Sequence, residues 1–111
     1  MEITIQEFKH CDLFKMKGRI DSSTAPEFSK ALEKANNDGH YKIAIDMSEL
    51  EYMSSAGFRA LLATQRNCKR YNRGELVLVS VPERIREALE LAGFTELFKT
   101  FEDSVEAVGS F

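Results

Sequence analysis

The first part of the chain alternates between apolar and polar residues. The segments EITIQEF, residues 2–8, and DLFKMKG, residues 12–18, both follow this pattern. A period of two is typical of a strand with one buried face. The polar residues 9–12 join the two segments over a short distance. The pattern therefore predicts an antiparallel hairpin at the start of the chain.

Helical spacing of apolar residues begins after this hairpin. A first helix is predicted over residues 25–36, where Thr24 and Glu27 have the spacing of a capping box and Pro26 falls in the first turn. Each of the three later helices also has a recognisable start. They are predicted to begin after the serine pair 54–55, after Pro82 and after Asp103.

Two apolar runs between the helices predict inner strands, YKIAIDM at residues 41–47 and ELVLVSV at residues 75–81. Strands separated by helices are parallel neighbours joined by right-handed crossovers. The tail, residues 97–111, adds a short extended piece before the last helix. We predict a single α/β domain over residues 1–111, with a small mixed β-sheet, an initial antiparallel hairpin, parallel crossovers and about four helices.

Composition and charge limit the kinds of partner. The chain has 111 residues, of which 43% are hydrophobic and 30% charged, as in a folded globular domain. The net charge of −3 comes without a run of like charges, so nucleic acid is not expected as a partner. No apolar stretch approaches the roughly 20 residues that span a bilayer, so we expect a cytoplasmic protein without direct membrane insertion. Cys11 and Cys68 are far apart and are expected to be reduced thiols.

Motifs of catalysis are missing from the sequence. There is no GxSxG, GxxxxGK[ST] or GxGxxG motif, and His10 and His40 fall in predicted turns away from the serine pair. Asp21 and Asp46 stand near predicted strand ends, where an Asp is most often a local turn or capping group. We expect a binding protein rather than an enzyme, with no cofactor, no catalytic residue and no metal.

The sequence Ser54-Ser55-Ala56-Gly57 stands at the junction between a strand and a helix. One serine is enough to cap a helix, so the second is free for another role. Glycine in the first turn costs about 1 kcal/mol relative to alanine, which indicates that a small residue is needed for close approach by another surface. A phosphate on a serine here would be stabilised by the free N–H groups and the dipole of the helix.

Three segments resemble the STAS domains, which are shared by sulfate transporters and bacterial anti-sigma-factor antagonists. They are GRIDSSTAPEF at residues 18–28, IDMSELEYMSSAGFRALL at residues 45–62 and LELAGF at residues 89–94. The central segment is the specific one, and the resemblance covers essentially the whole chain. A free-standing domain of this length resembles the antagonist type.

The resemblance implies a partner-switching cycle. In such a cycle an anti-sigma factor with serine kinase activity phosphorylates the antagonist, and a metal-dependent serine phosphatase removes the phosphate. Only the dephosphorylated antagonist captures the anti-sigma factor and releases the sigma factor. The matching acceptor is Ser55. Many members carry Asp where this chain has Ser54, which makes Ser54 a second candidate acceptor.

The resemblance also implies where the partner binds. It places the loop at residues 21–24 beside the phosphorylation site. An alternative from another class is a STAS accessory subunit of a transporter or signalling complex that is never phosphorylated. The expected partner-binding residues are Asp21, Ser22, Ser23, Thr24, Ser54, Ser55, Ala56, Gly57 and Arg59.

Overall fold

A five-stranded mixed sheet forms the centre of the structure, a computed structural model that describes all residues from 1 to 111. β1 runs antiparallel to β2, and every other neighbouring pair is parallel. This arrangement confirms the predicted α/β class with its initial hairpin. Across the sheet the strands follow chain order: β1 (Glu2–Glu7), β2 (Asp12–Ile20), β3 (Lys42–Met53), β4 (Glu75–Val79) and β5 (Thr100–Phe101).

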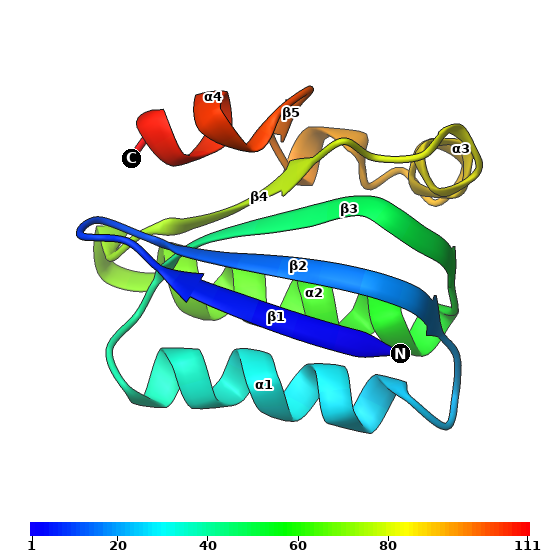
Figure 1. Ribbon diagram of the computed structural model, residues 1–111, viewed down its shortest axis with the longest axis horizontal. Coiled ribbons are helices and arrows are strands. Elements are labelled where there is room, and N and C mark those ends of the chain that lie inside the picture. Colours follow the sequence, from blue (N-terminus) through cyan, green and yellow to red (C-terminus); the bar gives the residue numbers. More distant parts are fainter.

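Four α-helices pack on this sheet. They are α1 (Ala25–Asn37), α2 (Ser55–Lys69), α3 (Glu83–Leu91) and α4 (Ser104–Gly109). Figure 1 shows α2 behind β1 and β2, α1 below these strands and α4 above the sheet. Short 3₁₀ turns follow α2 and α3, at Arg70–Asn72 and Thr95–Leu97. None of the helices has the length and apolar character needed to cross a membrane.

The main core lies between the sheet and helices α1, α2 and α3. Phe14 and Ile45 from the strands are completely buried there against Phe28 and Leu61 from the helices. A second, smaller cluster on the opposite face includes Ala107 of α4. Because β4 contributes to both clusters, its sequence is a continuous apolar run rather than an alternating one.

β3 extends six residues beyond its predicted end and stops at Met53 instead of Met47. The register of β2 against β3 shifts between residues 15 and 17, which breaks the regular alternation that sequence patterns detect. At this irregularity the carboxylate of Asp46 accepts a 2.9 Å hydrogen bond from the amide of Ser48. Asp46 therefore has a local backbone role, as expected, but within a strand rather than at its end.

The predicted capping box of α1 is wrong. Thr24 is the N-cap residue, but its side chain makes no capping hydrogen bond. Its hydroxyl instead donates to the carbonyl of Arg19 at 2.9 Å and accepts from the amide of Asp21 at the same distance. A capping box was also predicted for α4, from Asp103 and Glu106. One of its two hydrogen bonds is present, because the carboxylate of Asp103 accepts from the amide of Glu106 at 2.8 Å.

Candidate functional site

Ser54 joins the end of β3 to the start of α2. Its backbone is extended and its Oγ accepts a hydrogen bond from the amide of Gly57 at 3.4 Å, so it is the N-cap of α2. Its own amide donates to the carbonyl of Ile20 at 2.7 Å. Ser54 therefore holds the first turn of the helix and also the ends of two neighbouring strands.

Ser55 is the first residue of α2, and its side chain is exposed. Its hydroxyl makes no hydrogen bond within the protein, in contrast to that of Ser54. The first turn of α2 contains no acidic residue. A group attached to Ser55 Oγ would therefore meet solvent and the positive end of the helix dipole, which favours negative charge. The structure places Ser55 at a helix N-terminus on the surface, as the sequence predicted.

Gly57 is buried where α2 starts against the sheet. A Cβ atom at this position would lie 2.7 Å from Cγ of Met53 and 3.0 Å from Cγ2 of Ile20. Both distances are shorter than ordinary van der Waals contact, so only glycine lets the helix start this close to the strand ends. We expected a small residue at position 57 to permit close approach by another surface. That surface belongs to the same chain and is formed by Met53 and Ile20.

The loop before α1 is ordered around one carboxylate. Oδ1 of Asp21 accepts hydrogen bonds from the amide of Ser23 at 2.9 Å, from the hydroxyl of Ser23 at 2.7 Å and from the amide of Thr24 at 3.1 Å. These bonds, that of the Ser23 hydroxyl above all, lower the pKa of Asp21 because they stabilise its ionised form. Ser22 and Ser23 remain exposed. The carboxylate thus fixes a loop that presents two serines to solvent.

The loops at residues 21–24 and 54–57 lie next to each other, because Ile20 and Met53 are partners in the pairing of β2 with β3. A groove of about 330 Å³ runs between the first turns of α1 and α2. Among the predicted contact residues, Ser22, Ala56 and Arg59 line it. The groove also includes Ala25, Pro26 and Ala60.

A second, apolar hollow of about 90 Å³ lies where the end of β3 meets α2 and α3. Tyr52, Phe58 and Arg84 contribute to its lining from three different elements. The guanidinium of Arg19 lies 4.6 Å from the ring centroid of Tyr52, within the range of a cation–π contact. No motif in the sequence predicts this hollow. Its one local signal was an aromatic residue close to the serine pair.

Both histidines lie at the N-terminal ends of β2 and β3. The loops at residues 21–24 and 54–57 follow the C-terminal ends of the same two strands. His10 lies before β2 and His40 before β3, whereas Ser55 follows the C-terminal end of β3. In parallel neighbouring strands these are opposite ends of the sheet. The structure therefore places both histidines at the end of the sheet away from Ser55.

The chain matches the STAS domain over residues 2–107. It belongs to the STAS domain family. Among curated relatives, this STAS domain is 29% identical over 99 residues to the anti-sigma-B factor antagonist of Listeria monocytogenes. The match covers 89% of this chain and 85% of the relative.

Solved structures show the same fold. An anti-sigma factor antagonist from Mycobacterium paratuberculosis superposes with a TM-score of 0.86 at 22% identity, covering 98% of this STAS domain and 92% of that chain. The Bacillus cell fate determinant SpoIIAA, in its phosphorylated form, gives a TM-score of 0.78 at 14% identity, with 98% of both chains covered.

Proposed function

We propose that this STAS domain is an anti-sigma-factor antagonist that binds its anti-sigma factor through the surface around the start of α2. The name of the Listeria relative, which matches 89% of the chain, supports this class of function. The observation that carries the proposal is the pair of neighbouring serines. Ser54 is engaged as the cap of α2, whereas Ser55 presents a free hydroxyl to solvent.

The proposed contact surface divides into residues that touch the partner and residues that hold the surface in shape. The exposed or half-exposed residues Ser22, Ser23, Ser55, Ala56 and Arg59 contact the anti-sigma factor. The other expected residues act through the local hydrogen bonds and close packing of the two loops. These are Asp21, Thr24, Ser54 and Gly57.

Ser55 is the proposed switch, phosphorylated by an anti-sigma factor with serine kinase activity and reset by a metal-dependent serine phosphatase. The free N–H groups at the start of α2 favour a phosphate dianion, so the folded state tolerates the modification. At the interface the same dianion must lose its water, which costs several kcal/mol without a positive partner. A penalty of about 3 kcal/mol weakens binding more than a hundredfold. The existence of a phosphorylated form of SpoIIAA, a protein of the same fold, supports this scheme.

The test begins with the serine kinase that co-purifies with the protein from its native lysate. Incubation of that kinase with ATP and wild-type protein should give one phosphate, placed on residue 55 by mass spectrometry. Ser54→Ala should still be phosphorylated, whereas Ser55→Ala should not. For binding, Ser55→Ala should resemble the wild type and Ser55→Asp should be weaker. Equal affinity of the wild type and both Ser55 variants, without phosphorylation, would favour the accessory subunit of a transporter or signalling complex.

A further inference from the structure

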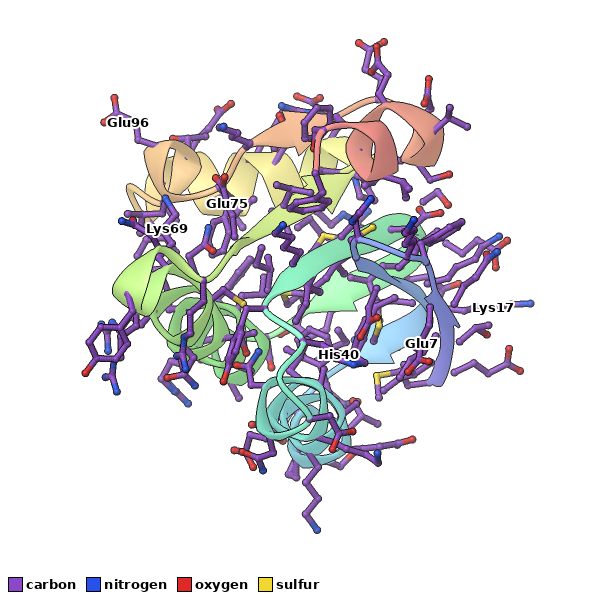
Figure 2. The ribbon with its side chains drawn as sticks, turned by 90° about the vertical axis from the view of Figure 1, so that its left-hand side faces the viewer. Glu7, Lys17, His40, Lys69, Glu75 and Glu96 are labelled. Atoms are coloured by element: carbon purple, nitrogen blue, oxygen red, sulfur yellow. The ribbon has the colours of Figure 1, made fainter.

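A histidine and two carboxylates converge at the end of the sheet opposite Ser55. Glu7 ends β1, Asp12 begins β2, and His40 lies in the loop before β3. One potential ligand atom from each side chain lies within 4.8 Å of the other two. Figure 2 shows Glu7 and His40 close together on this side of the molecule. We propose that these three residues bind a divalent transition-metal ion, for which zinc is the probe.

The separations of the three side chains suit one metal ion. Nδ1 of His40 lies 2.8 Å from Oδ2 of Asp12 and 4.0 Å from Oε1 of Glu7. Zinc binds nitrogen and oxygen ligands at about 2.0–2.2 Å, which places tetrahedral ligands roughly 3.4 Å apart. The two observed distances fall on either side of this value. The side chain of Glu7 is 71% exposed and can rotate to close the difference.

Asp12 is the buried member of the proposed site, so its side chain is held in place by the surrounding residues. Its side chain is only 6% exposed, and an ionised carboxylate is costly to bury without partners. Oδ2 is hydrogen-bonded to Nδ1 of His40 at 2.8 Å, and Oδ1 accepts no hydrogen bond from the protein. Oδ1 is therefore available to a metal ion, whereas Oδ2 and Nδ1 of His40 become ligands only when the ion displaces the proton that they share.

Charged side chains of both signs surround the site, because Lys9, Lys42 and Arg73 line the same cavity as Glu7 and Asp12. On α1, Lys34 and Asp38 pair with each other at 2.9 Å and largely cancel. Lys42 and Arg73 lie among the residues around the adjacent cavity of about 320 Å³, which also reaches all three proposed ligands. This cavity leaves room for a water molecule as the fourth ligand. Imidazole together with carboxylates suits zinc and its transition-metal neighbours better than the all-oxygen sites that calcium prefers.

This group could not be predicted from the sequence, because its members are separated by five and by 28 positions and form no ligand motif. The hairpin brings Glu7 opposite Asp12, since these residues are partners in the pairing of β1 with β2. Asp12 in turn pairs with Ile43 at the start of β3, close to the loop that carries His40. The site thus follows from the topology of the sheet rather than from spacing along the chain.

The test is calorimetric titration of the whole protein with zinc chloride. Wild type should bind one zinc ion, and His40→Ala should bind it at least about tenfold more weakly, or about 1.4 kcal/mol. Glu7→Gln is the variant that avoids any problem of folding, since its side chain is exposed, and it should also lose affinity. The matched controls are His10→Ala and Glu2→Gln, which change an exposed histidine of the hairpin turn and an exposed glutamate of the same strand.

A spectroscopic readout identifies the ligand atom. Zinc should shift the Nδ1 resonance of His40 in a nitrogen-15 spectrum and leave both nitrogens of His10 in place. The proposal is overturned if wild type shows no binding of one zinc ion at millimolar concentration. It is equally overturned if Glu7→Gln and His40→Ala bind as tightly as wild type, or if the control variants lose as much affinity as they do.

Discussion

The amide of Ser54 donates a 2.7 Å hydrogen bond to the carbonyl of Ile20. These residues immediately precede Ser55 and Asp21, so a single backbone contact fixes the relative position of the two loops that form the proposed surface. The same contact separates the roles of the two serines. Ser54 is bound to the fold through its amide and its hydroxyl, whereas the hydroxyl of Ser55 is free.

Ser54→Ala should lower the free energy of unfolding by about 1 kcal/mol, because it removes the cap of α2. Ser55→Ala should change it by less than about 0.5 kcal/mol, because an exposed hydroxyl without partners is lost. Urea unfolding of both variants beside the wild type measures the difference. A larger loss for Ser55→Ala than for Ser54→Ala would show that the two roles are reversed.

Gly57→Ala should lower the free energy of unfolding by about 1–3 kcal/mol, because the added methyl group meets Met53 and Ile20. Gly109→Ala in α4 is the matched control. No atom lies within 4 Å of a Cβ at that position, so stability should be unchanged or slightly higher. Unfolding by urea again gives the values. If Gly57→Ala left stability intact and only reduced partner binding, the glycine would serve the partner rather than the packing of α2.

The pKa of Asp21 is lowered in the folded protein, chiefly by the hydroxyl of Ser23. A lowered folded-state pKa gives stability above the unfolded value of about 3.9, and this stability is lost as pH falls through the folded value. Asp21→Asn should therefore be less stable than wild type at neutral pH, and the difference should shrink below about pH 4. Ser23→Ala should move the pKa of Asp21 upward. Unfolding at several pH values, together with carboxyl titration by NMR, tests both statements.

Local pattern was enough to predict the order of elements and the fold class. The starts of α2 and α4 follow from the capping residues Ser54 and Asp103, and that of α1 follows from Pro26 in its first turn. These signals act within a few positions along the chain. Gln65 shows where such a pattern carries less information. It occupies the apolar face of α2, where its side-chain amide bonds the carbonyls of Leu76 and Leu97 and its carbonyl accepts from the amide of Leu76. Only the fold shows that this buried amide joins α2 to β4.

The features that the sequence did not show depend on contacts between distant segments. Thr24 has the spacing of a capping residue, but Asp21 competes for its hydrogen bonds. The need for glycine at position 57 was visible, whereas its cause required the positions of Ile20 and Met53. The exposure of Ser55 could be predicted because a helix start fixes it locally. What a partner recognises around it is built from several elements and could not be predicted.

The central claim is that Ser55 controls a surface rather than the fold. The most direct test measures thermal melting and affinity for the anti-sigma factor on the same phosphorylated and unphosphorylated samples. We predict that melting shifts by only a few degrees, about 1 kcal/mol or less, because the phosphate lies at the start of α2. Affinity should fall at least about a hundredfold, or about 3 kcal/mol. A collapse of melting with unchanged affinity of the remaining folded protein, or unchanged affinity at unchanged melting, would contradict the claim.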